Sequence, residues 1–174
     1  MWSYSKIEGF GFIPVTCFSQ ALTTFIGQNL GAKEYDRAKK GALFGTICGI
    51  GIAEVIGIAV FFFSPYLIAA FGGDQRAIEY GIAEAHTIAL FYCLLAFSHC
   101  MAAIQRGAGR SIVPMFVMMI VWCGVRVTYI SIVIRIIPVI NVIYWAYPLT
   151  WFISSVIFLI LFLKTDWIHG LEKQ

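Results

Sequence analysis

Two ionisable side chains lie deep inside apolar stretches of this sequence. Glu54 is near the middle of residues 42–64, and Arg126 is within residues 112–137, in the segment GVRVTYI. A charge at the centre of a bilayer is costly, so each group must be neutral, paired or in contact with water. Glu54 could therefore carry a coupling proton, or it could be a hydrogen-bonded residue that fixes packing. Arg126 could pair with Glu54, or it could extend to the outer interface.

A sparse line of polar residues follows the stretch 82–105, and much of it shares one helix face. Its members are Glu84, Thr87, Ser98 and Gln105. His99 is next to this line, and Tyr92 lies on the same side as His99. Imidazole titrates near neutral pH, so His99, with Ser98, could belong to a proton pathway; the alternative is a hydrogen-bonded core histidine. Tyr92 and Gln105 are candidates for lining a cavity.

The first apolar stretch, residues 7–30, contains Gln20, Gln28 and Pro14. The two glutamines could line a polar cavity at membrane depth. Pro14 has no backbone N–H, so it should kink or break a helix locally. Such breaks persist in a membrane only where protein or water shields them. We therefore consider a hinge at Pro14, with an ordinary membrane-helix proline as the alternative.

Small residues recur at every fourth position near the start of the second stretch. They are Gly41, Gly45, Gly49, Ala53 and Gly57. On a helix this spacing keeps the small residues on one stripe. Without bulky side chains a neighbouring backbone can approach closely, which is how helices associate in lipid. The stripe, with Gly45, Gly49 and Gly57 at its centre, predicts a packing face and not a chemical site.

The sequence contains no pattern typical of an enzyme. It has no nucleophile–base pair, no metal-binding cluster and no phosphate loop, because its glycines lie in apolar stretches without a strand–turn–helix context. The cysteines lie inside apolar runs without CxxC spacing, which predicts buried thiols and not disulfides or metal ligands. They are Cys17, Cys48, Cys93, Cys100 and Cys123. We expect no enzymatic activity, no cofactor and no nucleic-acid partner.

The elements that position these groups are long apolar helices. Hydrophobic residues make up 60% of the chain and charged residues 12%, and the mean hydropathy is +0.86. A soluble domain is about 45–50% apolar and about 25% charged, so the expected solvent is a lipid bilayer. A spanning helix needs about 20 apolar residues, and five stretches qualify. These are residues 7–30, 42–64, 82–105, 112–137 and 142–163. The fold class predicted is an all-α polytopic membrane bundle, a single domain over residues 1–174.

Basic residues divide unequally between the two sides of such a bundle. If the helices alternate in direction, one side contains Lys33, Arg37, Lys39, Lys40, Arg106, Arg110, Lys164 and Lys173. The other side contains Lys6, Arg76 and Arg135. Because cytoplasmic loops are rich in Lys and Arg, we expect a cytoplasmic C-terminus in a multi-pass protein of the plasma or inner membrane.

Three segments resemble one transporter family. SQALTTFIGQNLGAKEYDRAKKG (19–41) is similar to the helix end and cytoplasmic loop of the multidrug and toxic compound extrusion (MATE) antiporters. MAAIQRGAGRSIVPM (101–115) resembles the inner loop of that family, with its arginine–glycine pair and following proline. FFFSPYLIAAFGGDQRAIEYG (61–81) is similar to the family's outer turn. The three segments occur in the family's order and cover nearly the whole chain.

The resemblance implies most of one six-helix lobe of a twelve-helix transporter. The five helices look like the last five, so the first lobe and one helix would be absent from this chain. Some members have an acidic residue in the middle of the helix that corresponds to residues 82–105. Here LFYCLLAFSHC contains no carboxylate, so that cation site is not expected.

The resemblance implies a part of a secondary transporter that exports organic, cationic, drug-like compounds in exchange for H+ or Na+. Its partners would be the lipid bilayer, a small organic substrate and the missing N-terminal lobe. One alternative is a truncated membrane protein without transport activity, or a helical scaffold that associates through the glycine stripe. A lipid-linked oligosaccharide flippase is disfavoured, because it needs a strongly cationic cavity and Arg126 is the one candidate.

Overall fold

The chain forms a bundle of long helices. The computed structural model describes residues 2–70, 75–136 and 141–168. The elements are α1 (Trp2–Gly31), α2 (Tyr35–Ala70), α3 (Gln75–Ala89), α4 (Tyr92–Gly107), α5 (Ile112–Met118), the π-helical η1 (Met119–Val125), α6 (Arg126–Ile136) and α7 (Asn141–Lys164). No strand occurs in these described ranges. The predicted all-α fold class is confirmed.

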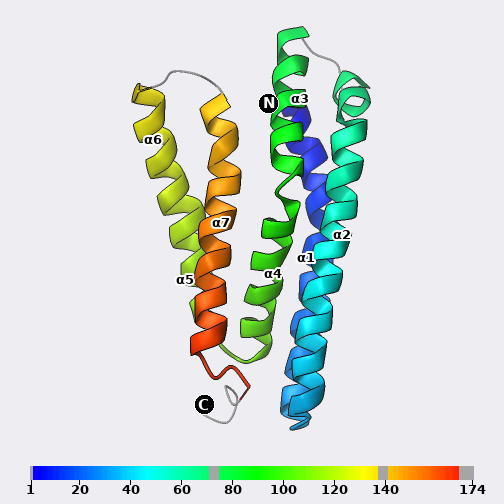
Figure 1. The fold of residues 1–174 in the computed structure, drawn as a ribbon, viewed down its shortest axis with the longest axis vertical. Coiled ribbons are helices and arrows are strands. Elements are labelled where there is room, and N and C mark those ends of the chain that lie inside the picture. Colours follow the sequence, from blue (N-terminus) through cyan, green and yellow to red (C-terminus); the bar gives the residue numbers. More distant parts are fainter. Residues whose placement is uncertain (1, 71–74, 137–140, 169–174) are drawn as a thin grey trace.

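Successive passes of the described helices along the bundle alternate in direction (Figure 1). α1 and α2 form an antiparallel pair, and α3 and α4 together make the third pass. α5, η1 and α6 make the fourth pass, and α7 makes the fifth. α4 packs against α1 and α2 on one side and against α7 on the other. α4 therefore connects the two parts of the bundle, together with α3, which also packs against α7.

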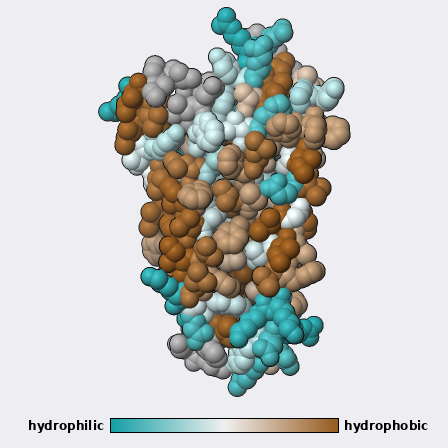
Figure 2. Space-filling model, viewed as in Figure 1, coloured by the Kyte–Doolittle hydropathy of each residue, from teal (hydrophilic) through white to brown (hydrophobic). Residues whose placement is uncertain are grey.

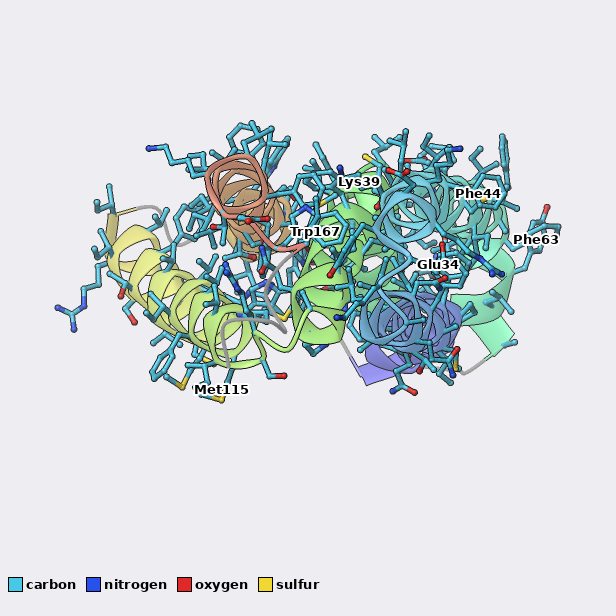
Figure 3. The ribbon with its side chains drawn as sticks, turned by 90° about the horizontal axis from the view of Figure 1, so that it is seen from below. Glu34, Lys39, Phe44, Phe63, Met115 and Trp167 are labelled. Atoms are coloured by element: carbon cyan, nitrogen blue, oxygen red, sulfur yellow. The ribbon has the colours of Figure 1, made fainter. Side chains whose placement is uncertain are left out.

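The surface of the bundle is suited to lipid. Three of the described helical segments are long and apolar enough to cross a membrane, and the bent pair α3–α4 makes a fourth. Figure 2 shows an apolar band around the middle of one face, with hydrophilic groups gathered at both ends. Phe44 and Phe63 point away from the bundle on the outer side of α2 (Figure 3), and both are exposed. The protein is a multi-pass membrane protein.

α1 is 30 residues long and contains the first expected span, residues 7–30. A series of polar residues runs along this helix: Thr16, Ser19, Gln20, Thr23, Thr24 and Gln28. α1 is also continuous through Pro14, so the expected break at this proline does not occur. A role for Pro14 as a hinge stays a prediction.

The third apolar stretch is not one helix. Residues 82–105, expected as a single span, belong to α3 and α4, whose axes meet at an angle of 55°. The break lies at Leu90 and Phe91 and contains neither proline nor glycine. Helix kinks usually coincide with proline, small residues or π-turns. The apolar pattern continues through the break, so the sequence contains no local signal for it.

The glycine stripe of α2 lies against its neighbours. Added Cβ atoms at Gly45 and Gly49 would lie 2.6 Å from the Leu22 side chain and 2.6 Å from Cys100 Sγ. At Gly41 the added atom would overlap the ring of Phe25. The stripe is therefore filled by side chains of α1 and α4, at the positions where the sequence predicted packing.

Most of the basic residues gather at one end of the bundle. The α1–α2 turn, the α4–α5 loop and the end of α7 lie together at the bottom of Figure 1. Arg110 Nη2 donates a hydrogen bond of 3.0 Å to the carbonyl of Asp166, which ties the loop to the C-terminal segment. Of the residues expected on one side, all but Lys173 share this end, and Lys173 lies outside the described residues.

Candidate functional site

Glu54 lies at a small pocket between α2 and the α3–α4 break. The pocket has a volume of about 140 Å³. Its lining consists of Glu54, Gly57, Ile58, Phe61, Phe62, Ala89 and Leu90. Glu54 is partly exposed. The thiol of Cys93, near the start of α4, lies next to its carboxyl group. Glu54 is therefore next to the point where the third pass changes direction.

Gly57 allows this close approach. A Cβ at Gly57 would lie 2.7 Å from the carbonyl oxygen of Ala89 and 3.4 Å from the Cβ of Tyr92. Any other residue here would have to displace the backbone of the break. Glu54 is three positions earlier on α2, and residues three apart share a helix face. The same glycine that admits the broken backbone thus brings that backbone next to a carboxyl group.

Arg126 lies among aromatic rings between η1 and α7. Its Nη2 donates a hydrogen bond of 2.9 Å to Thr150 Oγ1. The guanidinium carbon lies 4.2 Å from the ring centre of Tyr147 and 5.6 Å from that of Trp122. Contacts of a cation with aromatic faces contribute about 0.5–2 kcal/mol each. A hydroxyl and two rings therefore stabilise a charge that lipid would penalise.

The structure gives no support to the ion pair that was considered between Glu54 and Arg126. Glu54 contacts the α3–α4 break and Cys93, whereas Arg126 contacts α7. α4 packs against both α2 and α7 and so lies between the two sites. The described residues also contain no group of three or more His, Cys, Asp or Glu that could hold a metal ion.

The polar residues of α4 are buried within the bundle. The His99 ring lies 5.1 Å from the ring of Phe12 and 5.5 Å from that of Trp122. Ser98 Oγ donates to the carbonyl of Leu95 in its own helix, at 2.9 Å. Within the described chain, His99 Nε2 has no hydrogen-bond partner. The alternative of a hydrogen-bonded core histidine therefore has no support at this nitrogen.

Tyr92 and Gln105, expected to line a cavity, are enclosed by side chains. Tyr92 is 1% exposed and Gln105 is 2% exposed. Tyr92 belongs to a cluster with Trp151, whose ring centre is 6.1 Å away. Neither side chain is open to solvent in this arrangement of the helices.

Gln20 and Gln28 are instead exposed on α1. They share one side of the helix with two other exposed polar residues, Cys17 and Thr24. This polar face of α1 (Cys17, Gln20, Thr24 and Gln28) continues over about three helical turns. It differs from the exposed side of α2, which is formed by large apolar residues such as Phe44 and Phe63.

Two polar contacts of α2 were missed from the sequence. The first is the contact of Cys93 with Glu54, since the cysteines were expected only to be buried thiols. Cys17 and Cys123 are in fact exposed. The second is the hydrogen bond of His86 Nε2 to the carbonyl of Phe61, at 3.0 Å.

Pro65 explains the contact of His86. A proline removes the N–H that would bond to the carbonyl four residues earlier, which here is Phe61. His86 of α3 donates to that carbonyl from outside the helix and stacks on the Phe61 ring, with ring centres 4.3 Å apart. The proline was the available signal, because an orphaned carbonyl at membrane depth requires a donor from another element.

The sequence of this chain is similar to those of known proteins. The MatE family model matches residues 3–130. A protein described as "Probable multidrug resistance protein NorM" from Thermotoga maritima is 29% identical over 118 residues, which cover 67% of this chain and 25% of that protein. The chain therefore spans about a quarter of the length of this curated relative. Because the family model covers well over half of the chain, the resemblance noted in the sequence is confirmed: the chain belongs to the MatE family.

Proposed function

We propose that the chain is part of a secondary transporter of the cell membrane. It would export organic, cationic, drug-like compounds in exchange for H+ or Na+. Membership of the MatE family supports this function, as does the description of the Thermotoga relative as a probable multidrug resistance protein. The bundle supplies long membrane-spanning helices, which suits a carrier.

The polar face of α1 is the observation in the structure that carries this proposal. Glutamine side chains exposed at membrane depth are costly in lipid, and they are stable where they face protein or a water-filled cavity. Gln20 and Gln28 would therefore line the pathway of the substrate. The apolar side of α2 would face lipid.

A second lobe would complete the pathway. The proposed partner is an N-terminal lobe of the same protein, which faces the polar side of α1 across the cavity. Alternating access would rock the two lobes about a site near the midplane. With the basic end of the bundle in the cytoplasm, the C-terminus would also be cytoplasmic.

Glu54 is the proposed coupling residue. It is a carboxyl group in the membrane-spanning part of α2, and such groups are commonly functional. His99, Ser98 and Arg126 would belong to the surrounding pathway, and Pro14 could act as a hinge. Glu54→Gln should impair ion-coupled efflux without preventing insertion. Unchanged efflux between pH 6 and pH 8 would exclude Glu54 from the coupling mechanism.

Dye efflux from cells tests the whole proposal. We would compare cells that express this chain with cells that express a longer product extended upstream of Met1. Efflux from the longer product alone would support a lobe that needs its partner. Efflux from the short chain would show that these helices assemble a pathway themselves, and no efflux from either would contradict transport.

Replacing the two glutamines sharpens this test. Gln20→Leu together with Gln28→Leu should abolish efflux by the active product, because the polar face would become apolar. The matched control is Phe44→Leu on the exposed side of α2, which should leave efflux unchanged.

The scaffold alternative is less compatible with the structure. It needs the glycine stripe for association with other chains. Gly45 and Gly49 are already covered by side chains of α1 and α4. A transport-inactive product of a truncated gene is still tested by the efflux comparison above.

A further inference from the structure

An apolar groove lies between α2 and α7 at the basic end of the bundle. Its volume of about 430 Å³ is within the range of about 300–1,000 Å³ that is typical of ligand pockets. α4 forms the floor, where Phe97, Met101 and Ile104 follow one helix face at intervals of four and three residues. This groove and the pocket beside Glu54 have no lining residue in common, so the groove is a separate feature of the fold.

The walls of the groove come from α2 and from the end of the chain's last helix. On α2, Lys39, Leu43 and Thr46 line it, again at intervals of four and three residues. The Thr46 hydroxyl donates a hydrogen bond of 2.8 Å to the carbonyl four residues earlier, so it needs no partner in the groove. The opposite wall consists of Phe162 of α7 and of Trp167, whose stacked rings have centres 5.4 Å apart. Lys39 is therefore the charged member of an otherwise mainly apolar lining.

The groove adjoins the apolar exposed side of α2. Leu43, which lines the groove, is 66% exposed, and the neighbouring Phe44, which points away from the bundle in Figure 3, is 71% exposed. Large apolar side chains are stable in contact with hydrocarbon and not with water. An apolar groove also holds water poorly, because it offers few hydrogen-bond partners. The expected occupant of the groove is therefore a hydrocarbon chain from the bilayer.

One end of the groove is positively charged. Figure 3 views the bundle from its basic end and shows the exposed Lys39 close to Trp167 there. Residues 33–40 contain four basic side chains and two acidic ones, so the start of α2 has a net positive charge. Tryptophan is enriched at the level of the lipid headgroups. A lipid chain in the groove would thus have its polar end beside an ammonium group.

We propose that the groove binds one anionic phospholipid. An acyl chain lies between α2 and α7, and the headgroup phosphate accepts a hydrogen bond from the Lys39 ammonium. Basic pockets between membrane helices bind anionic headgroups in this way, and a lipid without net charge gains less from the same contact. With the basic end in the cytoplasm, the groove faces the leaflet in which anionic lipids are concentrated. Lipid binding at this site does not rest on the proposed transport.

Fluorescence quenching of Trp167 tests the site in the purified chain. The chain is placed in phosphatidylcholine nanodiscs that contain increasing fractions of a lipid with brominated acyl chains, which quench a tryptophan in contact with them. Subtracting the fluorescence of Trp167→Phe, which keeps a ring against Phe162, gives the signal of Trp167 alone. Brominated phosphatidylglycerol should quench half of this signal at about a fivefold lower lipid fraction than brominated phosphatidylcholine. The same fraction for both lipids would overturn the proposal.

Lys39→Gln separates the proposed contact from a general attraction of anionic lipid to the basic end. It should remove the roughly fivefold preference for phosphatidylglycerol, because one basic residue at an anionic membrane surface contributes about this factor. The matched control is Arg37→Gln, which removes the same charge two positions earlier on α2. Arg37 is exposed and does not line the groove, so the preference should change less than twofold. Equal losses in the two variants would show diffuse attraction by surface charge and no site at Lys39.

Thr46→Phe tests the apolar part of the groove. Thr46 is one of the lining residues, so the larger ring would extend into the space proposed for the acyl chain. Helix content and elution as a single species establish that the variant is folded. In the folded variant, Trp167 should lose its preferential quenching by phosphatidylglycerol, whereas a retained preference would show that no acyl chain occupies the groove. If the variant does not fold, the comparison of Lys39→Gln with Arg37→Gln decides.

Discussion

The α1–α4 part of the bundle and the α5–α7 part are held together by different contacts. In the first part the helices approach one another closely, because Gly45, Gly49 and Gly57 have no side chains. The space at these glycines is occupied by α1, α4 and the α3–α4 break. In the second part the α5–α6 pass is almost entirely open: 6% of its most apolar stretch is buried, against 28% for α2 and 39% for α7. Its attachment to α7 includes the contacts of Arg126.

The difference follows from the absence of a hydrophobic driving force in lipid. Apolar side chains gain little by leaving lipid for protein, so association needs close van der Waals packing or polar contacts. The glycine stripe supplies the first, and Arg126 with Thr150 and Tyr147 supplies the second. Close packing tolerates no added atoms, whereas the polar contacts can be removed one at a time.

The largest effect is expected at the closest backbone contact. Gly57→Ala would place a Cβ 2.7 Å from the carbonyl oxygen of Ala89. Overpacking of this kind costs about 1–3 kcal/mol. Unfolding of the chain in mixed micelles with increasing sodium dodecyl sulfate should show this loss. Gly51→Ala on the same helix, where no atom lies within 4 Å of the added Cβ, should be neutral or stabilising. Equal stability of the two variants would contradict the proposed role of the stripe.

Arg126 should have the next largest effect. Arg126→Ala removes the hydrogen bond to Thr150 and the contacts with two rings, at a cost of about 1–2 kcal/mol. We expect less folded protein in the membrane fraction and a lower midpoint of unfolding. Arg135→Ala is the control, because Arg135 is exposed on the same helix. If normal amounts of folded Arg126→Ala protein accumulate but efflux falls, Arg126 acts in transport and not in packing.

His86 tests whether the closely packed part also depends on a polar contact. His86→Phe keeps a ring against Phe61 but leaves the carbonyl of Phe61 without its donor, which should cost about 1 kcal/mol. The substitution Pro65→Ala restores an N–H four residues after Phe61. In a double-mutant cycle, His86→Phe should therefore cost less in the Pro65→Ala background. Equal costs in both backgrounds would show that the hydrogen bond is not the source of the effect.

The smallest effect is expected at Thr150. Thr150→Val retains the shape of the side chain and removes the acceptor for Arg126, and single hydrogen bonds between membrane helices average about 0.6 kcal/mol. Thr128→Val on the exposed side of α6 is the control. A loss at Thr150 as large as that at Gly57 would remove the distinction between the two parts of the bundle.

The comparison also shows why some positions were predictable from the sequence and others were not. The glycine stripe follows a strict period of four, so its place on α2 could be read directly. The surroundings of Arg126 could not, because the π-helical η1 changes the rotation of the side chains that follow it. Whether Arg126 pairs with Glu54 could not be decided from the sequence for a related reason, since charge alone does not reveal that α4 lies between them.

The sequence by itself determined the fold class, the membrane as solvent and the family. These properties depend on composition, on the lengths of apolar stretches and on local motifs. Each of these features is visible in the order of the residues along the chain. Only the tertiary structure revealed the break at Leu90 and Phe91 and its approach to Glu54. The apolar residues around that break are compatible with a continuous helix. In the fold, Gly57 of α2 leaves room for the broken backbone, and Glu54 lines the pocket beside it.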